Sequence, residues 1–440
     1  MSAFENATGA DGFLALWLTQ LLAETNLWRE RIGGIAQKLA AMARSFEGDG
    51  NLHRARMYAE ASIRWFGRAD KQEKAFEMTA FLAETWAREA MEKATANVQS
   101  NAMAASFYEL AIQIYRGIPR KQRGTLGVEN RLNELHRLMS EAGESSISEM
   151  GRVYSEGVNI SELIQRSINE VSGKELLEAL RAFTSMSVPS IAQRRERAEK
   201  MLRDTPLRGL FASSHIHSDG RVVAKVAGAN FDEPDSAEHQ SAVWAEMLTH
   251  YKIEVQVAVQ GVILPGFEVL VLERRMTEDV FVELAYRSPV VPRGRELLFA
   301  KGIVSGFERD FATALHLLVP QVENLVRWHL KAAGIRTTTL DAGGIETENG
   351  LSSLMDIPET TRVFGEELSF ELKAVFCDSL GANLRNELAH GLLDFEDCLS
   401  IWSIYAWWLV LRLLLMSFWN SQRRDPAPQT PNAPSGRSPE

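Results

Sequence analysis

The chain contains only two cysteines, Cys377 and Cys398, in 440 residues. Two thiols cannot form the disulfide framework of a small secreted protein, and they cannot supply a four-cysteine zinc site. The first twelve residues contain Glu5 and Asp11 but no basic region, which does not fit a secretory signal. We therefore expect a cytoplasmic protein that holds no metal.

The sequence also has no excess of positive charge and no phosphate-binding loop. Its 48 lysines and arginines face 58 aspartates and glutamates, which gives a net charge of −10. A general nucleic-acid coat is excluded, because affinity for phosphates needs clustered cations, although a local RNA site remains compatible with this charge. Neither GxxxxGK[ST] nor GxGxxG occurs, and no Ser-His-Asp order or pair of carboxylates stands out. We expect no cofactor.

What the sequence does have is helical periodicity along most of its length. Its hydrophobic content of 45% and charged content of 24% are ordinary for a soluble globular protein. These features predict a mainly α protein with domains at residues 1–145, 146–300 and 301–424, followed by a disordered, proline-rich tail at 425–440. A glycine- and serine-containing linker is expected at residues 143–146.

The first domain contains a weak internal repeat with an offset of 50 residues. Its apolar positions are Ala55, Tyr58, Ala61 and Trp65, and they recur as Ala105, Tyr108, Ala111 and Tyr115. Small residues let two helices approach, and an aromatic side chain fills the gap between pairs. The pattern resembles tetratricopeptide helical hairpins, but the usual period is about 34 residues. We therefore expect a helical-hairpin domain, a surface for a protein partner, rather than a true tetratricopeptide array.

The middle domain carries one strong hairpin signal. The turn sequence Ser218-Asp219-Gly220-Arg221 lies within a predicted strand region, residues 207–226. Residues 160–186 and 241–260 are predicted helices. The segment Val255–Val271 is predicted as helix, with a strand as the alternative, and Pro265 lies where the first turn of a helix tolerates it.

The third domain is predicted to be a bundle of four or five helices. Its expected helices are Phe307–Ala333, ended by Gly334, then Leu351–Ile357, Phe364–Leu380, one opened by the motif described below, and Phe395–Asn420. A polar loop is expected at Arg336–Asn349.

The last helix contains a long hydrophobic run. Residues 398–419 include four tryptophans and a single charged residue, Arg412, and their length would cross a bilayer. An arginine at a bilayer centre costs at least ~2.5 kcal/mol. A helix that is apolar on all sides also fits a buried bundle helix or a dimer seam. We expect one of these two, with membrane association through residues 398–419 as the alternative.

One short stretch, Arg385-Asn386-Glu387-Leu388-Ala389-His390-Gly391, contains candidate chemistry. On a helix Asn386 and His390 share a face, whereas Arg385 and His390 are about 140° apart. Histidine titrates near neutral pH and suits proton transfer, and arginine offers two donors to a phosphate. Asn386 could orient either group. The site needs a helix that begins near Arg385, or a second chain that completes it. The alternative is a structural set within a non-catalytic scaffold.

The pattern Arg-Asn-x3-His-Gly resembles the signature of the family catalogued as domain of unknown function 4209, and it resembles the R-x4-6-H motif of HEPN helical ribonucleases. Upstream segments resemble that family too: Ser288-Pro289-Val290-Val291-Pro292-Arg293-Gly294-Arg295-Glu296, Asp310-Phe311, Leu317-Leu318-Val319-Pro320-Gln321-Val322-Glu323 and Asn383-Leu384. The resemblance covers roughly residues 288–420. It implies a HEPN-like bundle that forms a homodimer and cleaves RNA without a metal, as an antiviral defence or toxin effector. It also implies that Arg385, Asn386 and His390 are the catalytic residues.

Overall fold

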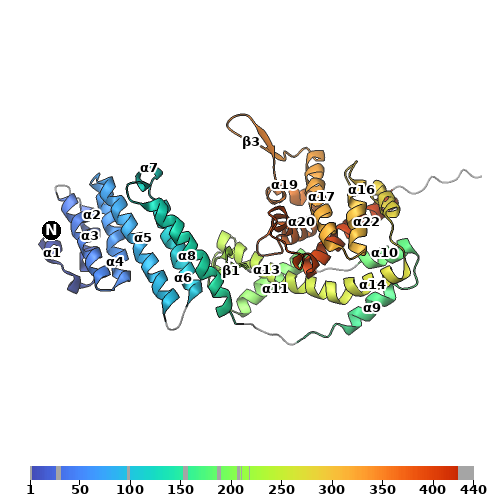
Figure 1. The fold of residues 1–440 in the computed structure, drawn as a ribbon, viewed down its shortest axis with the longest axis horizontal. Helices are drawn as coiled ribbons and strands as arrows, with labels where there is room; N and C mark the ends of the chain where they lie inside the picture. The colour runs from blue at the N-terminus through green and yellow to red at the C-terminus, as the bar shows by residue number, and fades with distance from the viewer. Residues whose placement is uncertain are drawn as a thin grey trace, which may run out of the picture. The chain divides into compact units, whose positions relative to one another are not determined.

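The computed structural model describes residues 2–25, 31–96, 100–151, 157–185, 190–205, 209, 211–217 and 219–424. Within these ranges the protein is mainly helical and contains two small sheets of two strands each (Figure 1). The predicted mainly α class is therefore confirmed. Contacts divide the chain into two compact units, residues 1–154 with 216–223, and residues 155–215 with 224–440. The predicted tail at 425–440 and the turn residue Ser218 lie outside the described residues.

The N-terminal unit is built from consecutive helices that pack side by side (Figure 1). They are α1 (Ser2–Asn6), η1 (Gly9–Asp11), α2 (Leu14–Thr25), α3 (Ile32–Gly48), α4 (Leu52–Arg68), α5 (Gln72–Thr95), α6 (Asn101–Arg116), α7 (Arg120–Arg123) and α8 (Val128–Glu149). The repeat occupies α4 and α6. Ala55 and Ala111 are fully buried, which lets neighbouring helices approach, and Tyr58 and Tyr108 fill the space between them.

The linker predicted at residues 143–146 is wrong. These residues continue α8, and both Gly143 and Ser146 are buried. Glycine and serine lower helix propensity by less than about 1 kcal/mol each, and packing in the helix readily outweighs that penalty. Small side chains are favoured here because they allow close packing.

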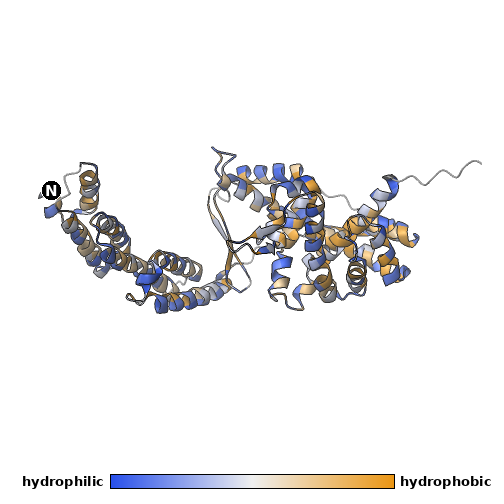
Figure 2. Cartoon of the chain, turned by 90° about the horizontal axis from the view of Figure 1, so that it is seen from above, coloured by the Kyte–Doolittle hydropathy of each residue, from blue (hydrophilic) through white to orange (hydrophobic). Residues whose placement is uncertain are grey.

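The second unit contains the remaining α-helices that the structure describes. They are α9 (Ser161–Val171), α10 (Leu176–Thr184), α11 (Ile191–Asp204), α13 (Ala237–Ala258), α14 (Leu264–Glu273), α15 (Glu278–Arg287), α16 (Glu296–Phe307), α17 (Phe311–Ala332), α18 (Leu351–Met355), α19 (Pro358–Phe364), α20 (Glu366–Leu372), α21 (Leu384–Ala389) and α22 (Ile401–Arg424). One hydrophobic core runs through them from Val171 to Phe418, and hydrophobic residues line the packed helices (Figure 2). The boundary expected at residue 300 falls inside α16 and within this single core.

Helix α22 lies inside this core, as expected for a buried bundle helix. Trp407 and Trp408 are fully buried, and their indole N–H groups donate to the carbonyl oxygens of Ile303 (3.1 Å) and Phe183 (3.2 Å). A dimer seam therefore cannot use these two tryptophans. Two helical stretches of the described chain, Ala237–Glu273 and Ile401–Arg423, are long and apolar enough to cross a membrane. Core helices of soluble proteins meet the same criterion.

Residues 237–273 form one continuous helix, so the strand alternative for Val255–Val271 is wrong. Pro265 lies in the first turn of α14, as predicted, but the π-helical turn η2 (Val259–Ile263) joins α14 to α13 without a break. A proline lacks an N–H group and crowds the carbonyl one turn earlier. The wider turn, in which the Leu264 N–H reaches the Val259 carbonyl, accommodates that ring.

Two strand hairpins occur where one was expected. The first, β1 (Ser213–Ile216) with β2 (Val222–Val226), confirms the predicted hairpin. The second, β3 (Thr338–Leu340) with β4 (Glu346–Glu348), replaces the polar loop predicted at 336–349 and pairs Thr339 with Thr347. Its turn is closed by Asp341, whose Oδ1 accepts from the backbone N–H groups of Gly343 and Ile345, both at 2.8 Å. A loop was predicted because the residues of these two strands are mostly polar and do not alternate with apolar ones.

Helix boundaries in the third domain also differ from the predictions. The helix predicted from Phe307 begins instead at Phe311, because Asp310 caps it by accepting from the Thr313 N–H at 3.0 Å. Its predicted end holds, with Gly334 in the left-handed region at φ 77°. The helix predicted over 364–380 comprises α20 and a π-helical turn, η3 (Lys373–Cys377).

Candidate functional site

The motif Arg385–Gly391 forms its own short helix. Helix α21 spans only Leu384–Ala389, follows Asn383 in the left-handed region at φ 50°, and ends at His390. Gly391, at φ 66°, allows the chain to turn back. The N–H of Gly391 donates to Leu388 and that of Leu392 to Glu387, at 3.1 and 2.8 Å, which is the Schellman pattern. His390 therefore sits at the carboxyl end of α21, where the chain bends.

Arg385 is held against α17. Its Nε donates to Oε2 of Glu323 at 2.8 Å, and one terminal nitrogen donates to Oδ1 of Asn386 at 3.2 Å. Gly350 lies directly beside the guanidinium, since a Cβ added there would be 3.0 Å from its second terminal nitrogen. The Arg385 side chain remains 26% exposed. It is thus fixed in orientation but open to solvent at its outer edge.

Glu323 accepts hydrogen bonds from two other groups besides Arg385. Its Oε1 accepts from Arg327 at 2.6 Å, and its Oε2 accepts from the Leu351 N–H at 3.2 Å. Burial raises the pKa of Glu323, but the hydrogen bonds from Arg327 and Arg385 outweigh that effect and hold its pKa below the ordinary value of 4.5. Glu323 is therefore ionised at neutral pH and balances part of the positive charge.

Asn386 is also fixed, and it orients the arginine rather than the histidine. Its Nδ2 donates to Oδ1 of Asn383 at 2.7 Å, which leaves its Oδ1 facing Arg385. Asn383 in turn donates to Oε1 of Glu387 at 3.1 Å. A chain of side-chain hydrogen bonds thus runs along α21.

The imidazole of His390 makes no hydrogen bond to Arg385 or Asn386, although the His390 backbone N–H donates to the Asn386 carbonyl at 3.0 Å. Its side chain is exposed, and within the described part of the chain its imidazole makes no hydrogen bond or ion pair. One chain thus brings Arg385 and Asn386 together and leaves His390 free at the helix end. This separation is what the spacing of about 140° on a helix predicts.

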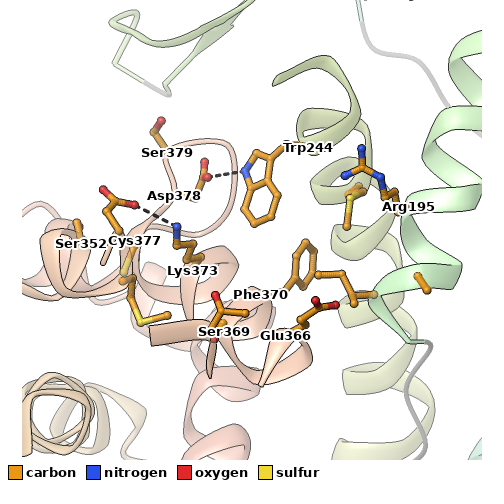
Figure 3. Close-up of a pocket in the computed structure, with 16 residues that line it drawn as sticks. Arg195, Trp244, Ser352, Glu366, Ser369, Phe370, Lys373, Cys377, Asp378 and Ser379 are labelled. Atoms are coloured by element: carbon orange, nitrogen blue, oxygen red, sulfur yellow. Dashed lines mark hydrogen bonds and ion pairs between the residues drawn. The ribbon is translucent and has the colours of Figure 1, made fainter. Parts of the chain in front are cut away.

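A cavity of about 820 Å³ is lined by residues of α11, α13, α18, α20 and η3 (Figure 3). Cys377 and Ser352 lie in its wall. Ser352 follows Gly350 and Leu351, which lie against Arg385 and its partner Glu323. Burial raises the pKa of Cys377 to about 12, so this thiol is neutral and is not an activated nucleophile. Sequence reasoning missed the cavity, because its lining comes from segments more than 100 residues apart and carries no local motif.

Among the residues that the structure describes, no group of three or more His, Cys, Asp or Glu side chains is placed to hold a metal ion. Comparison with protein-family models, with curated proteins and with solved structures finds no match to this chain. The site must therefore be interpreted from its own chemistry.

Proposed function

We propose that this protein is a metal-independent endoribonuclease of HEPN type, which cleaves flexible single-stranded RNA in the cytoplasm. The observation that carries the proposal is that one short segment holds an anchored arginine, still 26% exposed, and an exposed histidine. Arg385 is oriented by Glu323 and Asn386, and His390 lies at the exposed end of α21.

The reaction is a transesterification. The ribose 2′-oxygen attacks the adjacent phosphorus, the bond from phosphorus to the 5′-oxygen breaks, and a 2′,3′-cyclic phosphate and a free 5′-hydroxyl form. His390 removes the 2′-hydroxyl proton as general base, or gives a proton to the leaving 5′-oxygen as general acid. Arg385 binds the phosphate and offsets the charge that builds on it. Flexible RNA is required, because the 2′-oxygen must align with the phosphorus.

A specific observation favours a second candidate, a non-catalytic helical scaffold that binds a protein partner. Arg385 and Asn386 both have intramolecular partners, as residues with a purely structural role would. In that case the N-terminal helices would supply the binding surface. An effector role in antiviral defence or as a toxin belongs to the ribonuclease proposal.

The test is incubation of the full chain with single-stranded RNA in EDTA. We expect products that end in 2′,3′-cyclic phosphate, and no cleavage of DNA, which lacks the nucleophile. His390→Ala should reduce the rate by a factor on the order of 10² to 10⁴, the usual contribution of a positioned acid or base. Arg385→Lys should also lose activity, since a point charge cannot replace a two-donor fork.

Exchange of another exposed histidine, His316→Ala, serves as the control and should leave cleavage unchanged. Cleavage of DNA, or full activity in folded His390→Ala protein, would contradict the mechanism and favour the scaffold.

A further inference from the structure

One wall of the cavity is aromatic and can stack against a flat ligand. Trp244 of α13 is half-buried there, and its indole N–H donates to Oδ2 of Asp378 at 2.7 Å. Phe370 supports it edge-to-face, with ring centroids 5.2 Å apart. Because the only polar atom of Trp244 is already bonded, the surface that it offers to the cavity is aromatic. Asp378 is itself fixed by the Leu380 N–H, which donates to it at 2.8 Å, so the platform is rigid.

Positively and negatively charged side chains surround the aromatic pair of Trp244 and Phe370. Figure 3 shows Lys373 and Asp378 on one side of the aromatic pair and Arg195 on the other. Lys373 donates to Asp356 at 3.1 Å, so a donor and an acceptor lie side by side at the rim. The Ser369 hydroxyl in the wall has no hydrogen-bond partner among the described residues. The cavity therefore combines one stacking surface with both donors and acceptors.

The charges of the lining limit what can bind. Two cations, Arg195 and Lys373, are opposed by three carboxylates, which are Asp356, Glu366 and Asp378. A lining with this balance does not favour burial of a phosphate, because the Lys373 ammonium is already paired with Asp356 and the Arg195 guanidinium with Glu199. It suits a neutral flat group whose edge carries both N–H donors and acceptors. A cavity of this size lies within the range of about 300–1,000 Å³ of small-ligand sites.

We propose that this cavity binds one nucleoside unit, with the base stacked on Trp244 and the phosphates left outside. The base edge meets the Lys373–Asp356 pair. The same chemistry could come from a base of single-stranded RNA or from a free nucleoside. The RNA source rests on the proposed ribonuclease function, because Ser352 of the cavity wall directly follows Gly350 and Leu351, which lie against Arg385 and Glu323. Binding of a free nucleoside does not depend on the ribonuclease function.

The experiment measures binding to the full chain by calorimetry, with two probes. One is a single-stranded hexanucleotide carrying 2′-O-methyl groups, which cannot be cleaved. The second probe is a set of the four free nucleosides, each tested with and without a 5′-phosphate. Stacking of one base on an aromatic side chain contributes enough that Trp244→Ala should weaken binding about 10-fold or more, whereas Trp244→Phe should retain most of it. A 5′-phosphate should change the affinity of a free nucleoside little.

Tyr286→Ala is the matched control, because Tyr286 is an exposed aromatic residue on α15 outside the cavity. Binding of the hexanucleotide alone identifies RNA as the source, and binding of free nucleosides identifies a small ligand. The proposal is overturned if neither probe binds, or if Trp244→Ala and Trp244→Phe, both folded by thermal melting, bind as wild type does.

The two proposals can fail separately. If the protein does not cleave RNA but binds nucleosides through Trp244, the ribonuclease function is wrong and this inference stands. If the protein cleaves RNA and both Trp244→Phe and Trp244→Ala leave KM unchanged, the ribonuclease function stands and the nucleoside site is wrong.

Discussion

At the scale of single residues, charge compensation around Arg385 decides how the motif is held. The sequence predicted a helix at the motif that carries Arg385, Asn386 and His390. The structure confirms the helix for Arg385 and Asn386, but it ends at Ala389 and leaves His390 at its C-cap. The sequence could not identify Glu323, because that carboxylate lies 62 residues away and only folding brings it to Arg385. Ion pairs between distant segments leave no periodic signal in a sequence, so the orientation of Arg385 had to come from the structure.

The depressed pKa of Glu323 makes the stability of this site depend on pH. A carboxylate whose folded pKa is below its unfolded value stabilises the fold fully above the unfolded pKa, near 4.5, and this stabilisation is lost as the pH falls through the folded pKa. Glu323→Gln should therefore lower the Tm at pH 7, and the difference from wild type should shrink as the pH falls below 4.5. Thermal melting of both proteins from pH 7 to pH 3 measures this. A difference that grows in acid would contradict the assignment.

A second residue-scale prediction concerns Gly306 in α16. A Cβ at this position would overlap the indole of Trp407, which is fully buried and hydrogen-bonded to Ile303. Because the indole cannot move without breaking that bond, Gly306→Ala should destabilise the second unit by about 1–3 kcal/mol, the usual cost of overpacking a core. Denaturant unfolding followed by tryptophan fluorescence measures the loss.

The control for that substitution is Ser305→Ala in the same helix. Ser305 only donates to the carbonyl one turn earlier, at 2.9 Å, and alanine has the higher helix propensity. It should be neutral or slightly stabilising. Equal stability of Gly306→Ala and wild type would show that the core at Trp407 is looser than described.

At the scale of elements, helices were predictable and their ends were not. The apolar period of α4 and α6 marks their buried faces, so the existence of these helices followed from the sequence. The π-helical turn before Pro265 and the hairpin β3–β4 did not, because each depends on a local accommodation rather than on a repeating pattern. Gly143 and the serines of α8 also resembled a loop, because packing rather than helix propensity keeps them helical.

A glycine within α4 allows the effect of helix propensity on stability to be measured without a change in packing. Gly67 lies in the last turn of α4, is exposed, and has no atom within 4 Å of the position a Cβ would take. Gly67→Ala should stabilise the helix by up to about 1 kcal/mol, because alanine loses less conformational entropy. Slower hydrogen exchange of the α4 amides would measure the gain. Faster exchange would indicate a contact that the structure does not contain.

At the scale of the whole molecule, the separate cores match the two compact units. The two hydrophobic clusters of the N-terminal unit involve residues 4–82 and 83–142, and the core of the second unit begins at Val171. The candidate site and the cavity both lie in the second unit. The proposed ribonuclease site thus belongs to the second unit, and the proposed partner surface belongs to the N-terminal helices.

The separation of Arg385 from His390 predicts that a second copy of the chain completes the site. Arg385 points toward α17, whereas His390 is followed by Leu392, Phe395 and Leu399, which are 45%, 69% and 45% exposed. Exposed apolar residues next to an incomplete site favour an isologous contact, in which the same patch serves both chains. We expect a homodimer in light scattering, and a monomer for Phe395→Asp.

Mixing two inactive proteins, Arg385→Ala and His390→Ala, provides the decisive measurement. If Arg385 of one chain acts with His390 of the other, each mixed dimer contains one intact site, and half of the dimers are mixed. The mixture should then recover about a quarter of the wild-type rate, given random exchange of chains in a two-fold dimer. If both residues act within one chain, neither chain holds a complete set and no activity returns. Adding Phe395→Asp to both proteins should abolish the recovery, because it removes the contact that brings the two half-sites together.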